Sequence, residues 1–161
     1  MIGLQFVLGF GISSRAIAWF SAGHFSHVDA VMRDGSLIGA RSDWIEPLDG
    51  TAAIPPGVQR RPANYEHWKE RVVMTLPCDE LQEQSFIAFN ISQIGKPYDS
   101  TAIWGFVTGR DWRQQDSWFC SELQMAAIES TDLWVPLYTP RNKITPACLA
   151  TVASSVTGAT W

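Results

Sequence analysis

The residue best suited to covalent chemistry is Cys120, which lies in the segment Trp118-Phe119-Cys120-Ser121-Glu122-Leu123. We predict that a helix starts around residues 117–120, which places Cys120 in the first turn. Unpaired backbone amides and the helix dipole favour an anion there, so the position favours a thiolate nucleophile. The same amides can hold the oxyanion of a tetrahedral intermediate. Packing as a small buried hydrophobe is the alternative that position alone leaves open.

A histidine and a carboxylate lie two residues apart in the segment 26–32. The apolar residues Val28 and Ala30 alternate with them, which predicts a strand with His27 and Asp29 together on the opposite face. An imidazole beside a carboxylate can act as a general base with its orienting group. An exposed hairpin edge with ordinary polar residues is the alternative.

The remaining cysteines and histidines are predicted to have no catalytic role. Cys78 lies beside acidic residues, which raise the pKa of a thiol, and Cys148 lies in an apolar stretch. We expect His24 and His67 to be ordinary surface or loop residues. The spacing of His24 and His27 lacks a third ligand, so we expect neither a metal nor another cofactor. Three cysteines without a CxxC pair suggest no disulfide framework.

The composition predicts one globular domain over residues 1–161, with 46% hydrophobic and 17% charged residues. A net charge of −4 without a basic cluster argues against a nucleic-acid partner. The apolar segment 1–12 has no Lys or Arg before Arg15 and no clear cleavage site, so we expect no signal peptide. No apolar run reaches the roughly 20 residues of a membrane span. We therefore expect a soluble protein without stable membrane insertion, either cytoplasmic or virion-associated.

The hydrophobic pattern predicts an α+β domain that consists of a strand meander followed by helices. A hairpin turn at Asp34-Gly35 and a capping box at Asp79 and Gln82 are the strongest local signals. The predicted strands are 5–11, 26–32, 36–41, 58–61 and 71–76. The predicted helices are 15–22, 79–95, one that starts at 117–120, and a short one from 146. We expect the stretch 96–117 to be irregular.

Tryptophans are concentrated just before the cysteine helix. Trp104, Trp112 and Trp118 precede Cys120 within 16 residues. They can line a groove for a sugar or an acyl chain, and packing in the core or in loops is the alternative for each.

The order of four motifs resembles the permuted branch of the NlpC-type papain-like hydrolases, which includes lecithin:retinol-acyltransferase-like enzymes. In ordinary NlpC-type peptidases the cysteine helix precedes the histidine strand, whereas here the histidine comes first. The resemblance covers about residues 5–148. The motifs are Ser26-His27-Val28 after a helix that ends at Trp19-Phe20, then Gly95-Lys96-Pro97-Tyr98-Asp99, Phe119-Cys120-Ser121-Glu122-Leu123 and Ile144-Thr145-Pro146.

The resemblance implies a circularly permuted papain-like fold, with an antiparallel sheet and the nucleophile at a helix N-terminus. It implies that Cys120 attacks a carbonyl, while His27 activates the thiol and protonates the leaving group. Tyr98 resembles a tyrosine that lines the pocket of this group and donates a hydrogen bond to the substrate or the oxyanion. We expect Ser26 and Trp118 to complete the substrate-binding residues.

The chain departs from the family pattern at the group that orients the histidine. In the family a polar residue on the next strand, about a dozen positions on, has this role. Counting from His27 leads to Gly39, which has no side chain. Asp29, Asp43, a water molecule or a backbone carbonyl could orient the imidazole instead. Loss of the orienting carboxylate in a triad costs about 10⁴-fold in rate.

Three functions follow as expectations. The first is a cysteine peptidase or amidase that cleaves amide bonds in peptidoglycan stem peptides, in a phage or prophage context with other tail or assembly proteins as partners, or as a recycling enzyme. The second is a thiol acyl hydrolase or acyltransferase that acts on lipid-like esters. The third is a catalytically weak binding or structural module of an assembly, an interpretation that rests on Gly39.

Overall fold

The computed structural model describes residues 1–10, 23–100, 117–133 and 143–157. The predicted helix 15–22 lies outside these ranges, and so do residues 101–116 of the predicted irregular stretch.

Five antiparallel strands form one sheet with the order β4-β3-β2-β1-β5. All five predicted strands are confirmed, and their ends shift by a few residues. The largest shift is in β1, which begins at Ile2 and ends at Leu8. The strands are β1 Ile2–Leu8, β2 His27–Val31, β3 Leu37–Arg41, β4 Gly57–Arg61 and β5 Glu70–Leu76.

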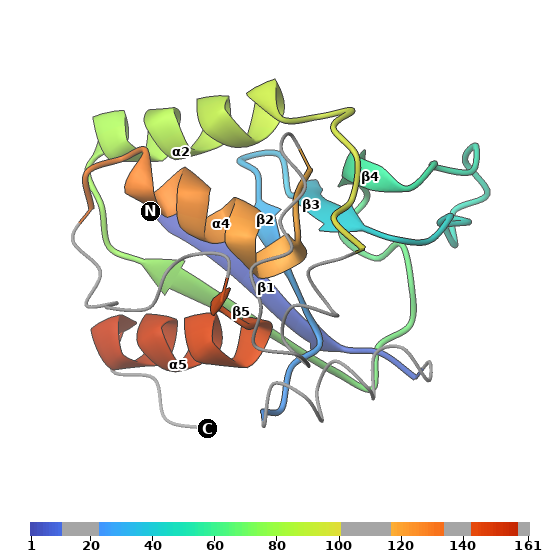
Figure 1. Ribbon diagram of the computed structural model, residues 1–161, viewed down its shortest axis with the longest axis horizontal. Helices are drawn as coiled ribbons and strands as arrows, with labels where there is room; N and C mark the ends of the chain where they lie inside the picture. The colour runs from blue at the N-terminus through green and yellow to red at the C-terminus, as the bar shows by residue number, and fades with distance from the viewer. Residues whose placement is uncertain (11–22, 101–116, 134–142, 158–161) are drawn as a thin grey trace.

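Three helices are described: α2 Glu80–Ser92, α4 Cys120–Glu129 and α5 Pro146–Thr157. Helix α4 packs against β2 and β3, α5 against β5, and α2 against α4 (Figure 1). The α+β class and the antiparallel sheet are thus confirmed. Helix α2 ends three residues before the predicted Gly95, and α5 has 12 residues rather than a single short turn. No helix in the described ranges is long and apolar enough to cross a membrane.

The two faces of the sheet have different interiors. One face carries Leu4, Phe6 and Val28, which join the main hydrophobic core beneath the helices. The other face carries Leu37, which packs with Ile45 and Tyr65 from the connecting segments. Side chains alternate between the faces of a strand, so His27 and Asp29 lie on the second face. The predicted separation of this pair from Val28 and Ala30 is confirmed.

Strand β2 pairs unequally with its two neighbours. Its partnership with β1 extends from Val31 to His27, whereas its pairing with β3 covers only Ala30↔Ile38 and Val31↔Leu37. The two strands meet at the predicted Asp34-Gly35 turn, where Gly35 has a φ of 80°. The His27 end of β2 therefore has no paired neighbour on the β3 side within the described residues.

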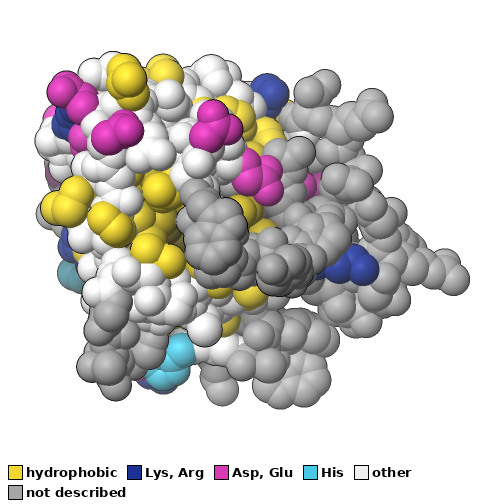
Figure 2. Space-filling model, turned by 90° about the vertical axis from the view of Figure 1, so that its left-hand side faces the viewer, with side chains coloured by type: hydrophobic (Ala, Val, Ile, Leu, Met, Phe, Trp, Pro, Cys, Tyr) yellow, Lys and Arg dark blue, Asp and Glu magenta, His cyan; other side chains and the backbone are white. Residues whose placement is uncertain are grey.

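Helix α2 buries fewer side chains than its sequence predicts. The apolar residues at positions 81, 86, 87, 89, 91 and 94 of the sequence favour a broad buried face. In the structure only Phe86 and Asn90 are buried, while Leu81 is 74% and Ile91 49% exposed. The reason is that α2 contacts the rest of the fold mainly through α4. Figure 2 shows acidic side chains gathered on the upper part of one face, at the level of α2, with hydrophobic side chains exposed below them.

The capping box of α2 leads to a prediction about stability. The Asp79 carboxylate accepts a hydrogen bond from the Gln82 amide at 2.8 Å, and the Gln82 side chain accepts one from the Asp79 amide at 3.1 Å. Asp79→Ala should lower the free energy of unfolding by about 1 kcal/mol in urea denaturation, whereas Asp79→Asn should cost a few tenths. Equal effects of the two substitutions would contradict this role.

Candidate active site

Cys120 is the first residue of α4, as predicted, and its side chain is buried. The hydroxyl of the next residue, Ser121, donates a hydrogen bond to the Ile144 carbonyl and ties this turn to the segment before α5. Burial raises the pKa of the Cys120 thiol to about 12, although hydrogen bonding to the backbone of Val28 and Ser121 opposes the rise. The resting group is therefore a thiol, and the thiolate expected from the helix position alone is not what this structure describes.

The thiol lies beside the histidine strand. It is close enough to Val28, the residue after His27, for the Val28 backbone to lower its pKa, and the Asp29 carboxylate acts on it in the opposite sense. Among the described residues, no hydrogen bond joins Cys120 to His27. Catalytic hydrogen bonds are often long in free enzymes and shorten when substrate binds.

His27 and Asp29 are joined by a hydrogen bond of 2.8 Å between Nε2 and Oδ1. Burial alone would raise the pKa of Asp29, but the charges of Arg61 and His27 and the bond to His27 hold it well below its usual range. An ionised carboxylate only accepts hydrogen bonds, so the imidazole proton lies on Nε2. Burial lowers the pKa of His27, which favours the neutral ring, and none of the described residues donates a hydrogen bond to its unprotonated Nδ1.

Four further side chains, which the sequence reasoning missed, surround this pair on the second face of the sheet. Arg61 on β4 contacts Asp29 Oδ1, and the Tyr65 hydroxyl donates to Oδ2 at 3.3 Å. Arg61 also donates to the Gln59 side chain at 3.0 Å. Arg41 donates to the Tyr65 hydroxyl at 3.2 Å. The available signal was the i, i+2 spacing of Gln59 with Arg61 and of Gly39 with Arg41, which places each pair on one face of its strand.

The structure distinguishes between the two carboxylates considered for orienting His27. Asp43 is engaged by Arg41, which donates to its two oxygens at 2.9 and 2.7 Å, and the Asp43 side chain is more than half exposed. Asp29 instead contacts the imidazole directly and is fully buried. Of these two residues, Asp29 has the geometry of an orienting group.

The three expected substrate-binding residues occupy different surroundings. Tyr98 lies beside the cysteine turn, with its ring 5.9 Å from that of Phe119, and the charge of Cys120 is among the causes that raise its pKa. Trp118 pairs with Tyr98 through a backbone bridge, but its indole donates to Gln93 at 3.1 Å, next to α2. Ser26 is buried, and its hydroxyl bonds to the β1 end rather than facing the thiol.

The other candidates considered from the sequence lie apart from this cluster. Cys78 and Cys148 are free and half-buried. His24 forms an ion pair with Glu70 at the start of β5. Within the described ranges, no three His, Cys, Asp or Glu side chains come together in a way that could hold a metal ion.

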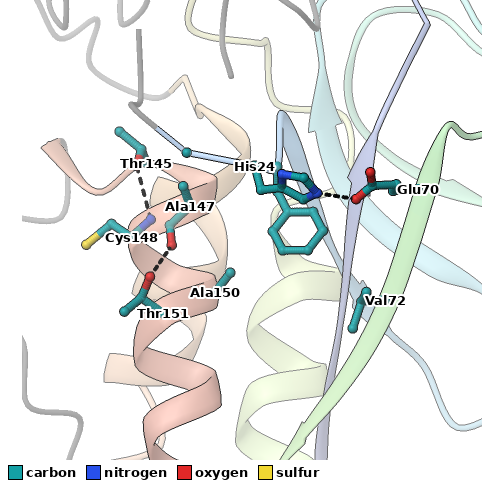
Figure 3. Close-up of a pocket in the computed structure, with 10 residues that line it drawn as sticks. His24, Glu70, Val72, Thr145, Ala147, Cys148, Ala150 and Thr151 are labelled. Atoms are coloured by element: carbon teal, nitrogen blue, oxygen red, sulfur yellow. Dashed lines mark hydrogen bonds and ion pairs between the residues drawn. The ribbon is translucent and has the colours of Figure 1, made fainter. Parts of the chain in front are cut away.

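A pocket of about 720 Å³ opens between α5 and the start of β5. Figure 3 shows the His24–Glu70 pair on one side and residues of α5 on the other, with Val72 on β5 below the pair. Its lining is mainly apolar apart from that pair and two threonines, Thr145 and Thr151. Two parts of the lining are close in sequence to residues of the candidate site. Residues 23–25 precede His27, and Thr145 follows Ile144, whose carbonyl accepts the hydrogen bond from Ser121.

No family model matches this sequence, and no curated protein is significantly similar to it. The interpretation of the site therefore depends on the geometry of its residues and on the motif resemblance.

The raised pKa of Cys120 predicts a loss of stability in alkali. Above pH 9 an unfolded thiol ionises while the folded thiol keeps its proton, so folding is disfavoured by up to about 1.4 kcal/mol for each pH unit. The free energy of unfolding should fall more steeply between pH 9 and pH 10.5 in the wild type than in Cys120→Ala. Parallel pH profiles for the two proteins would show that the folded thiol ionises normally.

Proposed function

We propose that this protein is a cysteine hydrolase that cleaves amide bonds, with Cys120 as the nucleophile and His27 as the general base. One observation carries the proposal: His27 is a buried, neutral imidazole whose Nε2 is bound to an ionised carboxylate, which leaves Nδ1 free to accept a proton. The thiol lies beside the backbone of the very next residue. The proposal requires the thiol and the His27 ring to meet at the end of β2, where pairing with β3 stops. A protonated thiol is then activated when the neutral base takes its proton during attack.

The reaction follows the usual order for acyl transfer. Cys120 Sγ forms a bond to the substrate carbonyl carbon while its proton passes to His27 Nδ1. The tetrahedral intermediate collapses, the carbon–nitrogen bond breaks, and the Nδ1 proton moves to the leaving amine. Water then attacks the acyl carbon and gives a proton to Nδ1. The carbon–sulfur bond breaks, the carboxylic acid leaves, and Nδ1 returns its proton to Cys120 Sγ. The backbone amides of the first α4 turn supply donors for the oxyanion, and Tyr98, which lies beside this turn, is a side-chain donor candidate.

The substrate class comes from the motif resemblance. Peptidoglycan stem peptides are the proposed substrate, within a permuted papain-like fold and a phage, prophage or recycling setting. The cytoplasmic or virion-associated location and the tail or assembly partners stay predictions from the sequence.

A second candidate, an acyl-ester hydrolase or acyltransferase, is favoured by the mainly apolar pocket between α5 and β5. Its walls are continuous in the chain with the segments that carry His27 and Thr145, so an aliphatic group could lie there while its carbonyl reaches Cys120. A thiol and imidazole pair acts on esters by the same acyl-enzyme route.

The third possibility, a weak binding module, rested on the missing side chain at Gly39. The contact between Asp29 and the imidazole weakens that argument, because it supplies a carboxylate by another route.

Product analysis tests the proposal. Wild-type protein incubated with purified peptidoglycan should release new amino groups, and Cys120→Ala and His27→Ala should lose at least about 10³-fold of this rate. Cys78→Ala, which changes a free cysteine outside the pocket lining, is the matched control and should retain activity. Cleavage of a fatty-acyl ester in place of peptidoglycan would favour the second candidate. Turnover of neither substrate would leave a binding module.

A further inference from the structure

We propose that Arg61 is the positioning residue of this site: it neutralises and fixes Asp29, and thereby keeps the His27 ring unprotonated at Nδ1. The contribution of Arg61 to catalysis rests on the proposed function. The effect on the protonation of His27 is a property of the folded protein and can be measured without a substrate.

The geometry places three buried groups around one carboxylate. Asp29 Oδ1 contacts both His27 Nε2 and a terminal nitrogen of Arg61, while Oδ2 accepts from Tyr65. Asp29 and Arg61 are completely inaccessible to water, and the guanidinium lies 4.8 Å from the Tyr65 ring centre. Gln59 holds the far side of the guanidinium. These contacts hold the Arg61 guanidinium against the carboxylate.

Charge balance explains why this contact matters for the imidazole. Asp29 and Arg61 together carry no net charge, so the buried ring beside them does not need to be positive. Without Arg61 the carboxylate would be an uncompensated buried charge, which is strongly unfavourable. The cluster would then take up a proton more readily. A proton on the ring would occupy Nδ1, and a proton on Asp29 Oδ1 would reverse the bond to Nε2 and move the ring proton to Nδ1.

The other charged groups near His27 form a separate balanced set. Arg41 is paired with Asp43 and with Glu66, which it contacts at 2.7 Å. Arg41 lowers the pKa of His27, and His27 lowers that of Asp43, but Arg41 and Asp43 are paired outside the Asp29 pair. Arg61 is therefore the cation that balances Asp29.

Gly39 provides the space for this arrangement. Its φ lies outside the left-handed region, so backbone conformation does not require glycine. A Cβ at this position would instead overlap Asp29 Oδ1 and approach Arg61 Nη2 to 2.9 Å. A side chain on β3 and the carboxylate from β2 thus exclude each other, which gives the departure at Gly39 a physical reason.

Nitrogen NMR of the histidine ring tests the role of Arg61. In wild-type protein at pH 7.5, two-bond ¹H–¹⁵N spectra should show His27 with Nε2 protonated and Nδ1 unprotonated. In Arg61→Met the proton affinity of the His27–Asp29 pair should rise far enough for the unprotonated Nδ1 signal to disappear at this pH. Arg61→Lys should restore most of the wild-type spectrum. Arg61→Gln provides the same test if the methionine variant does not fold.

Arg60→Met is the matched control on the same strand. Arg60 is exposed and bonds to Ser36 and Asp34 at the hairpin, away from the imidazole, so its loss should leave the His27 spectrum unchanged. An unprotonated Nδ1 in both Arg61→Met and Arg61→Gln would overturn the proposal. Failure of the wild type to hydrolyse any substrate would contradict the proposed function but would leave this measurement intact.

A double-mutant cycle tests the space at Gly39. Gly39→Ala should lower the urea midpoint of unfolding in the wild type, because the new methyl group displaces Asp29. In an Asp29→Ala background the same substitution should cause a much smaller shift. Equal shifts in the two backgrounds would show that the space at Gly39 serves another purpose.

Discussion

The contact between Asp29 and Arg61 is the constraint on which the second face of the sheet depends. Two charges buried without water are stable only when each has its opposite charge and its remaining hydrogen bonds. The strand between them, β3, must therefore carry no side chain at the point of contact, and Gly39 meets that requirement. Tyr65 adds a hydrogen bond to the carboxylate and Gln59 accepts one from the guanidinium. Because β3 lies between β2 and β4 in the sheet, the Arg61 side chain reaches Asp29 across β3.

The same pair also determines the resting protonation state of His27, the base of the proposed mechanism. Its charges cancel, so burial dominates and His27 stays neutral. Burial also dominates at Cys120. A rise in pKa from 9.0 to about 12 corresponds to about 4 kcal/mol, whereas a helix N-terminus stabilises an anion by about 1–2 kcal/mol at most. The resting site thus holds a thiol and a neutral base, rather than a preformed ion pair.

Local patterns in the sequence predicted the elements well. Alternation placed His27 and Asp29 on the face opposite Val28, and the capping box placed the start of α2, because both signals depend on neighbouring residues alone. The extent of burial was less predictable. The apolar pattern of α2 did not foresee the exposed Leu81, because burial depends on which helix packs nearby.

The candidate site was predictable in part for the same reason. Cys120 and Asp29 could be chosen from local context, and the placement of Asp29 against His27 agrees with one of the orienting groups considered. Arg61 could not be chosen, because it lies 32 positions from Asp29 along the chain and meets it only through the order of the strands. The missing side chain at Gly39 was interpreted as the loss of the orienting group, because the strand register that aligns Gly39 with Asp29 was unknown.

The three free cysteines allow a direct test of the central claim, that Cys120 is a nucleophile activated by His27. Simple accessibility favours Cys78 and Cys148, because both are half-buried while Cys120 is only 1% exposed. Peptide mapping by mass spectrometry after brief exposure to an activated peptide ester measures which thiol is acylated. The account predicts acylation of Cys120 in the wild type and its loss in His27→Ala. Acylation confined to Cys78 and Cys148, or of Cys120 to the same extent without His27, would contradict it.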